Sequence, residues 1–219
     1  MPSDSAIDRK ALPARERILL TAHDLFYREG IRATGVDKVI AASGVTKVTF
    51  YRHFPSKNDL IRAFLEYRHE RWMGWFEEAL RRHGALGGGG LLPLVPTLEE
   101  WFENPIYRGC AFINSVSELG GVLPDVLEIS GRHKEDMRRA ITALLPAFET
   151  RDAIATAAAM AVDGAIVKAQ LKPPAGGKTQ ALQGLKTILL ALEAESVPAN
   201  PPPTEPPAAR RAARSSKSG

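Results

Sequence analysis

The chain has 219 residues, of which 44% are hydrophobic and 25% charged, a content sufficient to bury a sizeable core in one or two domains. No uncharged apolar run reaches the roughly 18 residues of a membrane span, and residues 1–20 contain no apolar segment of signal-peptide length. The single cysteine, Cys110, excludes an intramolecular disulfide and a cysteine-rich zinc site. These features predict a cytoplasmic protein with no membrane span and no metal site.

The net charge of +4 is distributed unevenly along the chain. Residues 1–57 carry 10 basic and 6 acidic side chains, residues 58–195 carry 15 and 18, and residues 196–219 carry 4 and 1. Basic ends attract polyanions such as nucleic acid or an anionic membrane, whereas the acidic middle argues against a polyanion that lies along the whole molecule. Simple solubility explains the same charge pattern, so charge alone leaves the partner open.

Helical spacing of apolar residues recurs from segment to segment, and no sustained β-type alternation interrupts it. The first predicted helix follows Pro13 and ends at Gly30, and its apolar face consists of Ile18, Ala22, Leu25 and Phe26. A second, short helix covers residues 36–43, and a third follows Thr46. A long fourth helix begins at Ser56, where a Ser-x-x-Asp capping box stands.

Glycines at 84 and 87–90 then predict a flexible connector. Five further helices are expected beyond it, near residues 97–103, 108–119, 124–148, 151–171 and 178–195. The helix over 151–171 is rich in alanine and glycine, which lets another helix approach closely. The last helix carries a stripe for a core or a dimer interface, formed by Leu182, Leu185, Leu189 and Leu192. We therefore expect an all-α protein of about nine helices.

The two short helices that flank Gly44 have the spacing of a helix-turn-helix. Val39, Val45 and Phe50 are placed to form a small core, Gly44 supplies the tight turn, and Thr46 caps the second helix. A helical hairpin without any DNA-binding role would show the same pattern.

The segment after this turn carries more information, because residues 44–57 read GVTKVTFYRHFPSK and bring hydroxyl, aromatic and basic groups together. Such groups donate to phosphates and to base edges. The segment resembles the DNA-binding segment of the TetR family of transcriptional regulators, Gly-Val-Ser-Lys-x-Thr-Leu-Tyr-x-His-Phe-x-x-Lys. The resemblance starts at the first helix, includes Gly30, Thr34, Val36 and Val39, and covers about 45 residues.

The resemblance implies a recognition helix over residues 46–54 that enters the major groove of a palindromic operator in double-stranded DNA. The positions that it implies for DNA contact are Thr34, Thr46, Lys47, Val48, Thr49, Tyr51, Arg52, His53 and Lys57. Their chemistry agrees, since Thr49 and Tyr51 can donate to phosphate and Val48 can contact a thymine methyl. Phe50 and Phe54 are expected in the core instead.

Three positions depart from the family's usual residues. Gly35 stands where Ser or Thr is frequent, Val48 where Gly, Ala or Pro is common, and Ile40 where a small Ala usually faces the recognition helix. The larger side chain at position 40 can shift the crossing of the two helices, which affects the detailed groove geometry.

The resemblance also implies a homodimer through the helices near 151–171 and 178–195 and a small-molecule effector that releases a repressor from its operator. Ligand cavities are mostly apolar with few polar anchors. We therefore expect an apolar or aromatic effector in a pocket drawn from Trp72, Trp75, Phe76, Trp101, Phe102, Tyr107, Cys110, Phe112, Asn114, Glu118 and Met137. Ordinary core packing is the alternative for each aromatic residue, and an ion pair or surface position is the alternative for Glu118.

These inferences divide the chain into a flexible arm at 1–13, a helix-turn-helix domain at 14–57, an effector-binding and dimerisation domain at 58–195, and a disordered tail rich in proline and arginine at 196–219. We expect no cofactor and no enzymatic activity, because no hydrolase, zinc or nucleotide-binding motif is present. Two alternatives use Cys110, either as a redox sensor on the same DNA-binding domain or as the nucleophile of a thiol-dependent enzyme.

Overall fold

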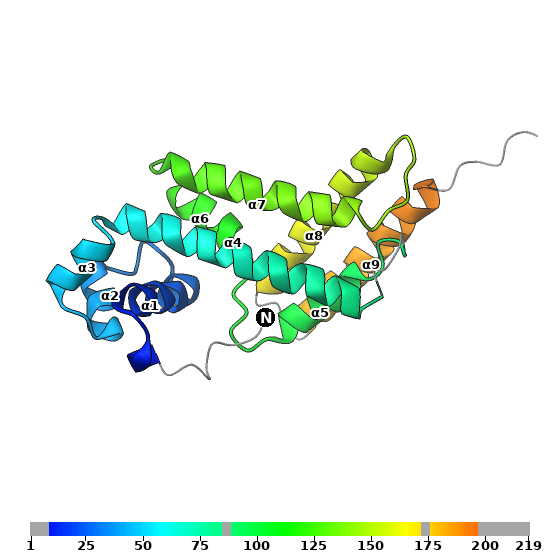
Figure 1. The fold of residues 1–219 in the computed structure, drawn as a ribbon. Helices are drawn as coiled ribbons and strands as arrows, with labels where there is room; N and C mark the ends of the chain where they lie inside the picture. The colour runs from blue at the N-terminus through cyan, green and yellow to red at the C-terminus, as the bar shows by residue number, and fades with distance from the viewer. Residues whose placement is uncertain (1–8, 85–88, 172–175, 197–219) are drawn as a thin grey trace, which may run out of the picture.

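The computed structural model describes residues 9–84, 89–171 and 176–196, and in these ranges the chain forms nine α-helices and a 3-10 turn without any β-strand. This confirms the all-α prediction. The 3-10 turn η2 (Arg9–Ala11) precedes three helices that gather at one end of the molecule, α1 (Ala14–Glu29), α2 (Val36–Ser43) and α3 (Lys47–His53) (Figure 1). Most of the arm expected at 1–13 and nearly all of the tail expected at 196–219 lie outside the described residues.

The 26-residue helix α4 (Lys57–Arg82) leads from this end along the length of the remaining fold (Figure 1). Five helices follow it: α5 (Leu94–Glu103), α6 (Ala111–Leu119), α7 (Pro124–Thr142), α8 (Arg151–Gln170) and α9 (Gly177–Ser196). Helix α7 packs against α4, α6 and α8, and α8 pairs closely with α9. The N-terminal helices and the larger domain are thus joined by one continuous helix.

Three helix limits differ from the predictions, each for a local reason. Helix α5 begins at Leu94 rather than near 97, because Pro96 falls in its first turn, where the missing N–H has no intrahelical partner. Helix α6 begins at Ala111 rather than near 108, because Gly109 has a φ of 80°. Helix α7 ends at Thr142 rather than near 148, since Pro146 cannot donate the next helical hydrogen bond.

The leucine stripe of α9 takes one of the two roles that the sequence left open. Leu185 and Leu189 are buried in the chain's own core, and Leu182 and Leu192 pack on its edge. The leucine stripe therefore belongs to the intrachain core. Other apolar side chains of these helices remain exposed, Met160 and Val167 on α8 and Ile188 and Leu190 on α9. None of the described helices combines the length and the hydropathy that crossing a membrane requires.

Candidate nucleic-acid interface and ligand pocket

A small apolar core beneath α2 and α3 holds the two helices together. Val39, Phe50 and Phe54 are fully or almost fully buried, and the Phe50 and Phe54 rings lie 6.2 Å apart between centroids. This confirms that both phenylalanines are core residues. Gly44 ends α2 with a φ of 65°, a left-handed conformation that favours glycine. The side chain of Thr46 accepts a hydrogen bond of 3.2 Å from the Thr49 N–H and so caps α3.

The outer face of α3 carries most of the side chains expected to contact DNA. Val48 is 71% exposed and Tyr51 is 41% exposed. Solvent also reaches Thr46, Lys47 and Arg52, whereas Thr49 and His53 are half-buried. Exposure of the apolar Val48 side chain to water does not stabilise the fold. Together with Tyr51 and the cations Lys47 and Arg52, it forms a surface that offers hydrogen-bond donors and one apolar contact to DNA.

Two of the residues expected to contact phosphate, Thr34 and Lys57, do not lie on the outer face of α3. Thr34 is buried, and its hydroxyl donates to the Gly30 carbonyl at 2.8 Å. Lys57 is half-buried, and its ammonium donates to the Ile31 carbonyl at 2.7 Å. Burial lowers the pKa of Lys57, and the nearby Glu118 carboxylate opposes that shift. Both side chains therefore secure the loop between α1 and α2 in this structure.

Comparison with known proteins agrees with this geometry. Residues 18–64 match the family model described as bacterial regulatory proteins, tetR family, and this range contains α2, the turn and α3. The helix-turn-helix segment of this chain is thus of the TetR-family type. A TetR-family regulator of Streptomyces coelicolor, SCO4454, has a TM-score of 0.69 and 28% identity over 82% of this chain and 95% of that one.

Two curated relatives match shorter stretches of this chain. The transcriptional repressor Rv3405c of Mycobacterium tuberculosis is 32% identical over 48% of this chain and 64% of its own length. The transcriptional activator FasR of Mycolicibacterium smegmatis is 34% identical over 32% of this chain and 33% of its own length. The chain thus matches less than two thirds of the length of these curated relatives.

Most residues that the sequence suggested for a pocket pack against one another instead. Trp72 stacks on Phe76 at 4.6 Å between ring centroids and meets Trp101 edge-on at 5.6 Å. Phe102, Phe112, Met137 and Cys110 are likewise buried. Three buried polar atoms of this domain, Trp72 Nε1, Thr97 Oγ1 and Ser130 Oγ, have no hydrogen-bond partner among the described residues.

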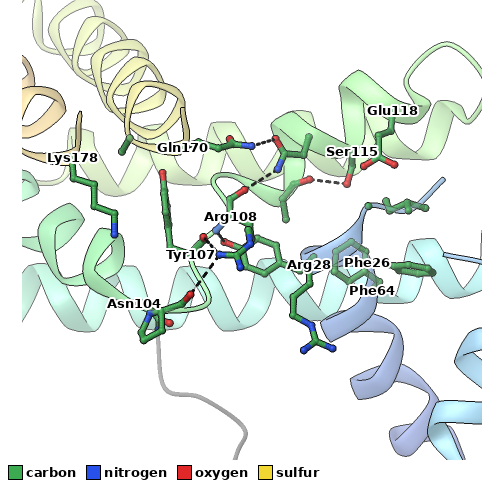
Figure 2. A pocket seen from close by; sticks show the side chains of 17 residues that line it. Phe26, Arg28, Phe64, Asn104, Tyr107, Arg108, Ser115, Glu118, Gln170 and Lys178 are labelled. Carbon is green, nitrogen blue, oxygen red and sulfur yellow. Dashed lines mark hydrogen bonds between the residues drawn. The ribbon is translucent and has the colours of Figure 1, made fainter. Parts of the chain in front are cut away.

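An open pocket of about 670 Å³ lies instead between α1 and the larger domain (Figure 2). Three of the expected residues line it, Tyr107, Asn114 and Glu118. Sequence reasoning missed its other walls, which include Phe26, Tyr27, Arg28, Gly30, Ile31, Phe64, Arg108, Ala111, Gln170 and Lys178. They come from α1, α4, α6, α8, α9 and two loops, so no local spacing could have grouped them.

Two sets of hydrogen bonds beside this pocket connect the N-terminal helices to the larger domain. The Tyr27 hydroxyl donates to the Gly109 carbonyl at 2.9 Å and accepts from the Arg108 N–H at 3.0 Å. Near the end of α6, the Glu118 carboxylate accepts from the Arg32 N–H at 2.8 Å, and the Arg32 guanidinium donates to the Glu118 carbonyl at 2.6 Å. The helix-turn-helix is thereby tied to both ends of α6.

Cys110, on which both alternative functions depend, is only 4% exposed. The side chain of Lys134 reaches it from α7. Burial lowers the pKa of Lys134, but Cys110 and Asp163 more than offset this and raise it above its usual value. A buried thiol has little access to an oxidant or a substrate, and access is what either role requires. Among the described residues, no group of three His, Cys, Asp or Glu side chains is placed to hold a metal ion.

Proposed function

We propose that this chain is a sequence-specific DNA-binding repressor that acts as a homodimer and is released from a palindromic operator by a small-molecule effector. The exposed face of α3 carries the proposal, because Lys47, Tyr51 and Arg52 extend from a helix whose opposite side is anchored by Phe50. The family consists of regulators and not of enzymes. Repression rather than activation is supported by the similarity to Rv3405c.

The proposed dimer uses the exposed faces of α8 and α9. Along α8, an apolar stripe at helical spacing contains Ala153, Ala157, Met160, Gly164, Val167 and Leu171. Along α9, exposed Gly184, Ile188 and Ala191 share one face. Two such helix pairs form a four-helix interface when they meet, and the small residues allow close approach. A two-fold axis then places two α3 helices in successive major grooves, about 34–36 Å apart.

The hydrogen bonds between the region of α6 and the N-terminal helices couple effector binding to DNA binding. An effector that moves α6 changes the position of the Tyr27 and Glu118 contacts, and hence the separation of the two α3 helices. The effector and the operator then weaken each other's binding by the same factor. Equal effector affinity of the free and the DNA-bound protein would contradict this coupling.

The decisive experiment is selection of binding sites from random DNA with the intact protein and with a Lys47→Ala, Tyr51→Ala variant. We expect the intact protein to enrich one palindrome and the variant to enrich none, because each lost contact costs about 1–3 kcal/mol of discrimination. An Arg81→Ala, Lys186→Ala variant serves as the control, because these exposed cations lie on α4 and α9 and not on α3. Weak binding without sequence preference by all three proteins, with a steep dependence on salt, would overturn the proposal.

A further inference from the structure

The interdomain pocket combines an apolar floor with a cationic rim. We propose that it binds a small amphipathic anion, an aromatic or aliphatic carboxylate, and that this ligand is the effector. The assignment of a ligand class rests on the function proposed above, whereas the binding site itself is tested without DNA. A volume of about 670 Å³ is within the range of small-molecule sites.

The floor of the pocket is suited to the apolar part of such a ligand. Phe26 and Phe64 form one end, where their rings meet edge-on at 5.4 Å between centroids. Ile31, Ala111 and the ring of Tyr107 extend the apolar surface. Figure 2 shows Phe26, Phe64 and Glu118 at one end of the pocket and Asn104 and Lys178 at the other, with Arg108 between them.

Three cations line the pocket, and none of them pairs with a carboxylate of the described residues. The Arg108 guanidinium donates to the carbonyl of Tyr107 at 2.8 Å, and the Lys178 ammonium donates to that of Phe102. Arg28 makes no hydrogen bond or ion pair within the described ranges. Carbonyl groups leave the positive charges uncompensated, so a ligand carboxylate gains charge-assisted hydrogen bonds there.

Glu118, the one acidic residue among the described residues of the lining, does not cancel this charge. Glu118 already accepts a hydrogen bond from the Arg32 N–H at 2.8 Å, and Lys57 lies close enough to interact electrostatically with it. Its carboxylate is therefore committed to the loop after α1. A ligand cation that reached Glu118 would have to compete with these partners while passing three like charges.

A fourth positive charge, that of Arg68, lies next to Tyr27, which lines the pocket. Arg68 is buried, and its guanidinium carbon lies 4.1 Å from the centroid of the Tyr27 ring, whose residue lines the pocket. Its hydrogen bond to His23 Nε2, at 3.2 Å, involves a ring nitrogen, and no carboxylate among the described residues pairs with it. A buried charge without a counterion raises the positive potential around it, which favours an anion in the adjoining pocket.

The position of the pocket explains how its occupant would act on the DNA-binding domain. Its lining includes both residues that connect the domains, Tyr27 on α1 and Glu118 on α6. A carboxylate held by Arg108 and Lys178 rests against α1 through its apolar part. Binding therefore favours a different separation of α1 and α6, and this shifts the helix-turn-helix.

The test compares 2-naphthoate with its neutral counterpart 2-naphthamide, by calorimetric titration of the DNA-free protein. We expect the carboxylate to bind about tenfold more tightly or better, since the two compounds differ by charge-assisted hydrogen bonds. An Arg108→Gln, Lys178→Gln variant should lose that preference and retain its affinity for the amide. An Arg81→Gln, Lys186→Gln variant removes the same two charge types from exposed sites outside the pocket and should retain the preference.

Equal affinity of the wild-type protein for both compounds would overturn the assignment. So would an unchanged preference in the Arg108→Gln, Lys178→Gln variant, because the compound would then bind elsewhere, for instance among the aromatic residues around Trp72. Thermal unfolding of each variant verifies that it is folded. Site selection on DNA is measured separately, so absence of an operator would contradict the proposed repressor while a carboxylate preference still supported the anion site.

Discussion

At the scale of single residues, the buried His133 makes the fold sensitive to mild acid. Burial, with Lys134, His69 and Arg68 nearby, lowers the pKa of His133 from 6.5 to about 2. Between these values the unfolded chain binds a proton that the folded protein does not, so stability decreases as pH falls below 6.5. We predict that His133→Gln reduces the stability lost between pH 7 and pH 5 by about 1–2 kcal/mol, measured by urea unfolding.

The packing around His133 supports this prediction. Its ring stacks on Phe112 at 3.6 Å between centroids and approaches Trp72 at 5.0 Å, so a charged imidazolium would have little access to water. The same substitution at His53, half-buried on α3 and outside this aromatic cluster, serves as the control. Equal pH slopes for the wild-type protein and the His133→Gln variant would show that another group carries the acid sensitivity.

At the scale of helices, the contact between α1 and the start of α6 depends on one hydroxyl. The Tyr27 hydroxyl joins the Gly109 carbonyl and the Arg108 N–H inside the fold. Its removal leaves these groups without their partner, which costs about 1–3 kcal/mol. We predict that Tyr27→Phe lowers the free energy of unfolding by about that amount. We also predict that it weakens the coupling between effector and operator, measured as the ratio of operator Kd values with and without effector.

The chain offers a matched control for this change. Tyr51→Phe also removes a tyrosine hydroxyl, but from an exposed position on α3 where it makes no hydrogen bond to the described residues. It should leave the free energy of unfolding nearly unchanged and lower only the affinity for DNA. If both variants unfolded alike, Tyr27 would not carry the contact between the two domains.

At the scale of the whole molecule, the exposed apolar faces of α8 and α9 predict the state of assembly. Met160 is 70% exposed and Leu171 is 61% exposed, which is costly unless another surface covers them. We predict that Met160→Asp converts a dimer into a monomer in analytical ultracentrifugation, because a carboxylate would be buried without a partner. Loss of the dimer should also weaken operator binding, since two half-sites must be bound together.

Val122→Asp is the control, because Val122 is equally exposed and apolar but lies in the turn after α6. It should remain dimeric. A monomeric wild-type protein, or a Met160→Asp variant that stays dimeric, would refute this use of α8 and α9.

The turn between α2 and α3 could be predicted from the sequence, because the interactions that form it are local. Gly44, Thr46 and the Val39–Phe50 contact lie within a dozen residues, and each fixes the backbone by its own chemistry. The helical period also predicted each of the nine α-helices that the described part of the chain forms. The limits of α6 and α7 differ from the predicted ones, because Gly109 and Pro146 interrupt the helical pattern.

The pairing of helix faces could not be predicted from the sequence, because it depends on how distant segments pack. A stripe such as Leu185 and Leu189 shows that a helix face is apolar, but the same period fits a core or a dimer, and here it fits the core. The aromatic residues near Trp72 suited a cavity by composition, yet they fill the space between helices. The open pocket arises where α1 meets α6, from residues up to about 150 positions apart, and such a meeting depends on packing rather than on any local signal.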